Sequence, residues 1–223
     1  MNKVALLMAA SVAALLAGGA SSSGLLSASP SAKAGPVPKA NKFLYNQNST
    51  YGGTLVNSEN FTSGSSSSYS DQGADDFVIP TGRTWAIREV DVSGQYYENS
   101  TGPANSENVI FYKDRKGMPG KPVRKGTFSN LHGTDTEGNF AVALPRKGIT
   151  LRAGTYWVSV IANMDFQSEG IWSWDINGVQ HGNQAMWQNP EGGWGICQTW
   201  GTIENCADTG PDFMFALRGS SKR

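Results

Sequence analysis

Hydrophobic and polar residues alternate with a period of two in several short stretches, a pattern typical of β-strands. The clearest stretch is Leu151–Ala162, where a Gly-containing turn at Ala153-Gly154 leads into a run rich in aromatic and β-branched residues. Its two faces are both largely apolar, with Tyr156, Val158 and Val160 on one and Trp157, Ser159 and Ile161 on the other. We therefore predict a central strand covered on both sides, with Trp157 in a core.

The same reasoning predicts about ten short strands separated by turn residues. They are Phe43–Asn46, Gly53–Val56, Ala74–Pro80, Thr84–Tyr97, Glu107–Tyr112, Val123–Ser129, Asn139–Leu144, Leu151–Ala162, Ile171–Ile176 and Pro211–Gly219. A Pro-Thr-Gly turn at residues 80–82 is expected to end the third strand. A slip in alternation between Ile87 and Val90 predicts a β-bulge at Arg88-Glu89.

Frequent short strands without helical periodicity indicate an all-β protein. We predict a single antiparallel β-sandwich, jelly-roll-like, over residues 43–219, followed by a short tail at residues 220–223. The Ser-rich run Ser63–Ser70 is expected to be a flexible loop. Trp172 and Trp174 share one face of their strand, but the pattern does not say whether that face is buried.

The first 34 residues have the features of a secretory signal peptide. Lys3 supplies the positive charge, Val4–Ala17 is an apolar segment too short to span a bilayer, and Ala32-Lys33-Ala34 matches a small-x-small cleavage site. The alternative, an uncleaved membrane anchor, is disfavoured by the length of this segment. We expect a mature start near Gly35, an extended linker at residues 35–42 and no membrane span, hence a secreted or periplasmic protein.

Charge and cysteine content refine this interpretation. Lys3 and Lys33 are the only charged residues before Gly35, so 16 basic residues face 18 acidic ones in the remaining part. This balance gives no electrostatic argument for nucleic acid or an anionic membrane as a partner. Cys197 and Cys206 are the two cysteines. In an exported protein they are expected to form a disulfide contributing about 2–3 kcal/mol, with free thiols or metal ligation as the alternatives.

Several short motifs follow one another in a definite order along the chain after residue 34. They are Ala74-Asp75-Asp76-Phe77, Trp85–Tyr97, Val109–Tyr112, Asp114, Gly117, Pro119, Gly120, Leu151, Gly154, Tyr156, Trp157, Trp172, Trp174, Trp187 and Asp212-Phe213 with Leu217-Arg218-Gly219. Their order resembles a family of secreted bacterial β-sandwich modules, mostly of unassigned activity, that also occur in surface-anchored proteins. The resemblance covers nearly all of the chain after residue 34 and implies a jelly-roll-like sandwich outside the cytoplasm, without a transferable catalytic signature.

The Trp-rich C-terminal third suggests a ligand site, because sugars stack on exposed rings while amides and carboxylates hold their hydroxyl groups. Trp187, Trp194 and Trp200 lie in Gly- and Pro-rich surroundings and are expected to be the more exposed rings. Gln184 and Asp175 are candidate polar partners. The alternative is that most of these rings fill the core.

Two other site chemistries have weaker support. Oxygen ligands for calcium are available from Asp75, Asp76, Asp114, Asp208 and Asp212, but no known calcium-binding spacing is present. Carboxylate pairs for a glycosidase are Glu169 with Asp175, or Glu191 with Glu204. His132 and His181 lie in polar loops and form no zinc motif.

We therefore expect a secreted, non-catalytic module that binds a glycan or cell-surface ligand through its Trp-rich third. The alternatives are a secreted carboxylate-based hydrolase and a structural matrix or surface protein.

Overall fold

The computed structural model describes residues 42–64, 66–97 and 100–223 of the chain. The described residues belong to one compact unit. The predicted signal peptide and all of the predicted linker except Lys42 lie outside them, so these two assignments stay predictions.

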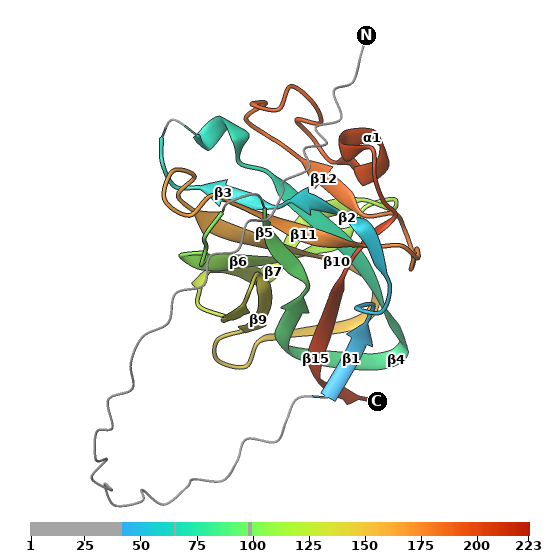
Figure 1. Cartoon of the computed structure of the whole chain (residues 1–223). Coiled ribbons are helices and arrows are strands. Elements are labelled where there is room, and N and C mark those ends of the chain that lie inside the picture. Colours follow the sequence, from blue (N-terminus) through green and yellow to red (C-terminus); the bar gives the residue numbers. More distant parts are fainter. Residues whose placement is uncertain (1–41, 65, 98–99) are drawn as a thin grey trace, which may run out of the picture. The chain divides into compact units, whose positions relative to one another are not determined.

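Two long antiparallel strands, β4 (Gln72–Val92) and β10 (Ile149–Met164), form the centre of the larger sheet (Figure 1). The sheet order along its main path is β1-β15-β4-β10-β6-β7. The neighbours are β1 (Lys42–Asn46), β15 (Phe215–Lys222), β6 (Ser106–Asp114) and β7 (Pro119–Leu131). Shorter strands attach at the margins, namely β3 (Glu59–Phe61), β8 (Thr134–Thr136), β9 (Asn139–Ala143), β12 (Met186–Gln188) and β13 (Gly201–Thr202).

The smaller sheet is centred on β11 (Ile171–Asn177). Its other strands are β2 (Tyr51–Asn57), β5 (Gly94–Tyr97) and β14 (Asp212–Phe213). All strand pairs among the described residues are antiparallel except that of β3 with β10. The prediction of an all-β sandwich is confirmed.

The main core lies between the two sheets and is rich in aromatic rings. Trp172 and Trp174 are fully buried in it, which settles the side of β11 that they occupy. The Trp174 ring stacks on Phe213 at a centroid distance of 4.5 Å, and Trp172 stacks on Phe140 at 4.8 Å. Both indole N–H groups donate to backbone carbonyls, so burying these rings leaves no donor unpaired.

The predicted central strand is confirmed by β10, which is covered on both faces. Val158 and Val160 belong to the main core, whereas Trp157 belongs to a second apolar cluster on the opposite face of the sheet. That cluster also contains Tyr112 and Met186 and is packed against Trp200. The Gly- and Trp-rich segment after β11 therefore acts as an outer cover for the larger sheet.

One turn prediction is wrong and one bulge prediction is confirmed. Chain reversal was expected at Pro80-Thr81-Gly82, but β4 continues through this point. Residues 80–83 bulge out of the ladder with β10, and a bulge tolerates a proline that cannot donate a backbone hydrogen bond. The predicted bulge at Arg88-Glu89 is present, because the pairing of β4 with β15 shifts register there.

The C-terminal strand prediction divides into two elements. β14 pairs with β11 in the smaller sheet, whereas β15 lies between β1 and β4 in the larger one. Phe213, Phe215 and Leu217 all enter the main core, as their alternation predicts. β15 extends to Lys222, into the predicted tail.

Two short helical turns escaped the sequence analysis because they are too brief to show helical periodicity. A 3-10 turn, η1 (Ser67–Tyr69), occupies part of the Ser-rich run, and α1 (Ile203–Ala207) follows β13. The Thr202 side chain caps α1 by accepting from the Asn205 backbone N–H. No helix among the described residues is long and apolar enough to cross a membrane.

The aromatic core should dominate stability. We expect Trp174→Ala to lower the free energy of unfolding by about 3–5 kcal/mol, because it removes a fully buried ring and leaves a cavity. Urea denaturation measures this change. Val78→Ala is the control, since Val78 is exposed and its loss should cost less than about 0.5 kcal/mol. Equal losses in the two variants would contradict the assignment of the core.

Candidate functional site

A cavity of about 500 Å³ lies among β3, η1 and the loop that follows β12. Figure 1 places these three segments at the same end of the molecule, although they are far apart in sequence. Most of the residues that line it have polar side chains: Glu59, Asn60, Ser67, Ser68, Ser70, Asp71, Gln72, Asn108, Ile161, Pro190 and Glu191. Hydroxyl, amide and carboxyl groups therefore converge on one space.

Two buried acids, Glu59 and Asp71, lie at this cavity. The Asp71 Oδ1 atom accepts a hydrogen bond from the Glu59 backbone N–H at 3.0 Å, and Glu59 Oε1 accepts from the Trp172 backbone N–H. The other Glu59 oxygen, Oε2, is buried without a hydrogen-bond partner. A buried polar atom without a partner is costly, so Oε2 is a candidate contact for a ligand.

The environment disfavours negative charge on both acids. Burial raises the pKa of Glu59 well above its usual value, and the nearby Asp71 carboxylate raises it further. Burial likewise raises the pKa of Asp71, against the opposing effect of hydrogen bonds from the Glu59 backbone and from Trp194. Each carboxyl group therefore stays protonated and neutral to a higher pH than an exposed Glu or Asp side chain does.

Two partly exposed aromatic rings lie beside the cavity. Trp194 is 41% exposed and Tyr69 is 42% exposed, and the rings meet edge to face at a centroid distance of 5.3 Å. The Trp194 indole N–H donates to the Tyr69 carbonyl at 2.9 Å and to Asp71 Oδ2 at 3.1 Å. The ring is therefore held in place through a residue that lines the cavity, while part of its surface remains open to solvent.

The disulfide supports the loop that carries Trp194. Cys197 and Cys206 are bonded, which confirms that prediction. The Cys197 carbonyl accepts from the Asn189 backbone N–H at 2.8 Å, and Asn189 Oδ1 accepts from the Trp194 backbone N–H at 2.9 Å. Asn189 also donates to the carbonyls of Ser68 and Ser70, so one buried amide joins both sides of the site.

The structure does not bring the five predicted ligand residues together. The expectation that Trp187 is exposed is wrong, because its ring is buried against the main core and donates to the Asn57 carbonyl. Trp200 is half-buried against Tyr112. The Gln184 side chain donates a hydrogen bond to the carboxylate of Glu204 in α1. Trp194 is the predicted ring that lies beside the cavity.

Asp175 lies in a different cavity of about 750 Å³. There its Oδ1 accepts from Gln95 Nε2 at 2.9 Å, and burial raises its pKa. The same cavity is lined by Tyr96, Asp135 and other polar residues. Because Tyr96 donates its hydroxyl proton to Asp135 at 2.5 Å, that ring is already engaged within the protein.

The candidate calcium ligands are largely occupied by protein donors. Asp76 accepts from both the backbone and side-chain amides of Asn183, and Asp114 accepts from the Trp157 indole. Asp208 is exposed, and it is its backbone N–H that caps the end of α1 by donating to the Glu204 carbonyl. Within the described part of the chain, no group of three or more His, Cys, Asp or Glu side chains is arranged to hold a metal ion.

Asp75 and Asp212 form a buried acidic pair. Asp75 accepts three hydrogen bonds, from the Gln47 side chain and the Asp76 and Phe213 backbones. Asp212 Oδ2 accepts from the His181 backbone, whereas its Oδ1 has no partner. Burial raises the pKa of Asp212 to about 7, and burial together with Asp212 raises that of Asp75.

The predicted hydrolase pairs do not meet in one cavity. The Glu169 carboxylate accepts hydrogen bonds from the Asn105 side chain and the Asp165 backbone, and Glu169 does not line the cavity that contains Asp175. Glu191 lines the cavity beside Trp194, but its predicted partner Glu204 does not. His132 is exposed, and His181 Nδ1 lies 3.8 Å from Asp212 Oδ2.

Sequence reasoning missed Glu59, Asp71 and Tyr69 as site residues. Nothing local separates these residues from other polar loop positions. Glu59 and Asp71 meet through hydrogen bonds that form only when the chain between them turns back, and Trp194 comes from a segment far along the sequence. The alternation in Ser58-Glu59-Asn60-Phe61 offered a weak signal of a strand, without indicating that Glu59 is buried.

No protein-family model, curated protein or solved structure matches this chain. The resemblance to secreted bacterial sandwich modules therefore stays a prediction.

The acidic pair predicts a pH-dependent stability. Folding raises the pKa of Asp212, so protonation of this group stabilises the folded protein. This stabilisation is complete below about pH 4, near the pKa in the unfolded chain, and is lost as the pH rises through about 7. We expect the wild-type melting temperature to fall over this range and Asp212→Asn to flatten part of the fall. Differential scanning fluorimetry measures both profiles.

The control for this experiment is Asp208→Asn, which changes an exposed acid in a left-handed conformation that Asn tolerates. Its profile should follow the wild type. An Asp212→Asn profile parallel to that of the wild type would show that Asp212 does not carry the dependence.

Proposed function

We propose that this protein is an exported, non-catalytic module that binds a glycan at the cavity beside Trp194. The observation that carries the proposal is the pair of exposed rings, Trp194 and Tyr69, next to a lining of hydroxyl, amide and carboxyl groups. The exported setting rests on the signal-peptide pattern of residues 1–34.

The lining chemistry suits a polyhydroxylated ligand. Ring surfaces remove the apolar C–H face of a sugar from water, while amides and hydroxyls exchange hydrogen bonds with its hydroxyl groups. Glu59 Oε2 adds a contact that has no partner within the protein. Since its environment favours a protonated carboxyl, Glu59 can donate to a sugar oxygen as well as accept.

The ring arrangement also favours binding without large rearrangement. Trp194 is fixed by its hydrogen bonds to Tyr69 and Asp71, and its loop is tied to η1 through Asn189. A ring fixed before binding loses little conformational freedom when a ligand stacks on it. This supports recognition by a preformed surface.

Glycan-array screening of the purified protein, followed by calorimetry on the best ligand, tests the proposal. We expect Trp194→Ala to weaken binding by roughly tenfold or more, since the stacked ring is lost. Tyr51→Ala is the matched control, because Tyr51 is at least as exposed as Trp194 but lies on β2 and does not line the cavity. Binding of no glycan, or equal effects of the two variants, would refute the proposal.

A hydrolase using carboxyl groups is the second candidate, favoured by the free Glu59 oxygen close to Asp71 in the same cavity. Its expected signature is turnover of a bound oligosaccharide that Glu59→Gln abolishes while leaving affinity nearly unchanged. A ligand recovered intact after prolonged incubation would refute catalysis. A chain that binds no glycan and turns over none would instead fit a structural matrix or surface protein.

A further inference from the structure

The positive charge of this chain is concentrated on a small part of it. Residues 113–125 carry six Lys or Arg residues and one acid, Asp114, and residues 146–152 carry three Lys or Arg residues and no acid. Arg83 belongs with them, as the pairing of the strands shows below. We call these ten cations the basic face: Arg83, Lys113, Arg115, Lys116, Lys121, Arg124, Lys125, Arg146, Lys147 and Arg152.

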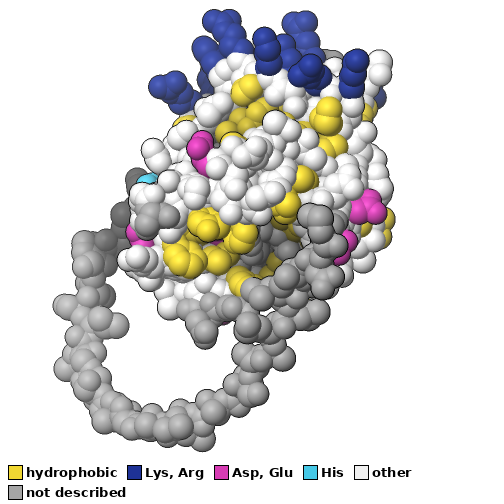
Figure 2. Space-filling model, turned by 90° about the horizontal axis from the view of Figure 1, so that it is seen from above, with side chains coloured by type: hydrophobic (Ala, Val, Ile, Leu, Met, Phe, Trp, Pro, Cys, Tyr) yellow, Lys and Arg dark blue, Asp and Glu magenta, His cyan; other side chains and the backbone are white. Residues whose placement is uncertain are grey.

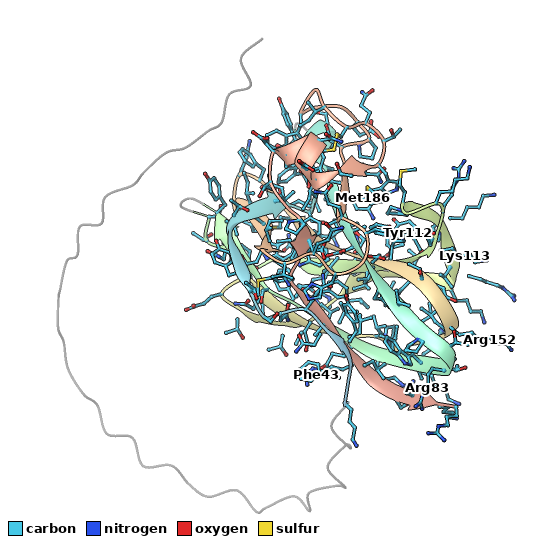
Figure 3. All side chains as sticks on the ribbon, turned by 90° about the vertical axis from the view of Figure 1, so that its right-hand side faces the viewer. Phe43, Arg83, Tyr112, Lys113, Arg152 and Met186 are labelled. Carbon is cyan, nitrogen blue, oxygen red and sulfur yellow. A yellow bond between two sulfur atoms is a disulfide. The ribbon has the colours of Figure 1, made fainter. Side chains whose placement is uncertain are left out.

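The sheet brings these segments to one side of the molecule. Arg152 of β10 pairs opposite Thr84, the residue after Arg83, and Tyr156 of β10 pairs opposite Lys113. Figure 2 shows the Lys and Arg side chains gathered along one edge, with the visible Asp and Glu side chains elsewhere. In Figure 3, a view along a different axis, Arg83, Lys113 and Arg152 all lie along the same side of the molecule.

Among the described residues, no Lys or Arg of the basic face forms an ion pair with an acid. The cation that does form ion pairs in the described part of the chain is Arg218, with Glu89 and Asp91, and it lies outside this face. Asp114 is directed to the Trp157 indole and the Gly117 backbone. The near-neutral charge of the whole chain therefore hides a strongly positive surface, and the sequence argument against an anionic partner does not hold locally.

The form of this surface indicates a broad partner. Most of the ten side chains are exposed, and none lines either of the two cavities described above. None of the large exposed aromatic residues lies on these segments, so they offer no platform for stacking bases. Met118, which is 41% exposed, lies in the β6–β7 turn between Lys116 and Lys121.

We propose that the basic face binds the surface of an anionic phospholipid bilayer, with Met118 entering the headgroup region. Lysine and arginine side chains are attracted to anionic headgroups, and an apolar side chain at the centre of a basic turn adds burial that a soluble polyanion does not offer. Binding is peripheral and reversible. It uses none of the residues of the Trp194 cavity and is independent of the proposed glycan binding.

Sedimentation with vesicles tests this inference on the purified protein. We expect binding to phosphatidylcholine vesicles that contain phosphatidylglycerol, and none to phosphatidylcholine alone. Raising salt from about 0.1 M to about 1 M shortens the screening length from about 10 Å to about 3 Å and should release the protein. Binding that is indifferent to lipid charge and salt would overturn the proposal.

Two triple variants, one that removes positive charge and one that keeps it, test whether vesicle binding depends on the charge of these side chains. Lys116→Gln, Lys121→Gln and Lys125→Gln together should weaken vesicle binding roughly 100-fold, at about fivefold for each cation. The corresponding Lys→Arg triple variant should bind like the wild type. All three side chains are exposed, and circular dichroism checks that both variants are folded. Equal binding by the Gln variant and the wild type would refute the role of this face.

Met118→Ser distinguishes a bilayer from a soluble polyanion. We expect it to weaken vesicle binding several-fold and to leave binding to inorganic polyphosphate or RNA unchanged. A wild-type protein that binds those polymers tightly but not anionic vesicles would overturn the proposal in favour of a polymeric partner. Unchanged vesicle binding by Met118→Ser would refute the proposal that Met118 enters the headgroup region.

Discussion

The antiparallel ladder between β4 and β10 is the constraint on which the rest of the structure depends. One edge of β4 pairs with β10 and β9, and the other pairs with β12 and β15, so four strands take their register from it. β10 in turn aligns β6 and the short β3. Because side chains alternate along these two strands, the ladder also decides which residues face the main core and which face the outer cover.

The surfaces discussed above are consequences of that ladder at different places along it. The last residues of β10 hold β3, and with it Glu59, beside Asp71 at the Trp194 cavity. The first half of β10 aligns Arg152 with the β4 bulge, and Tyr156 with Lys113, at the basic face. The two regions therefore lie on one rigid scaffold and involve separate side chains, so each can have its own partner.

Much of the fold was predictable, because strand alternation is a local property. The central strand, the bulge at Arg88 and the inward faces of Phe213, Phe215 and Leu217 all followed from period-two patterns. The turn predicted at Pro80-Thr81-Gly82 was wrong, because proline and glycine are equally compatible with a bulge within a strand. The cavity was not predictable, since Glu59, Asp71 and Trp194 meet only through long-range pairing. The basic face was hidden because net charge averages over the whole surface.

The position of β15 also affects when this sandwich can form. Residues 215–222 fill the gap between β1 and β4, and Asp212–Phe213 immediately before them pairs with β11 in the opposite sheet. Each sheet is therefore complete only when its part of residues 212–222 is in place. Docking of this one segment therefore couples the two sheets, because β14 joins the smaller sheet and β15 joins the larger one.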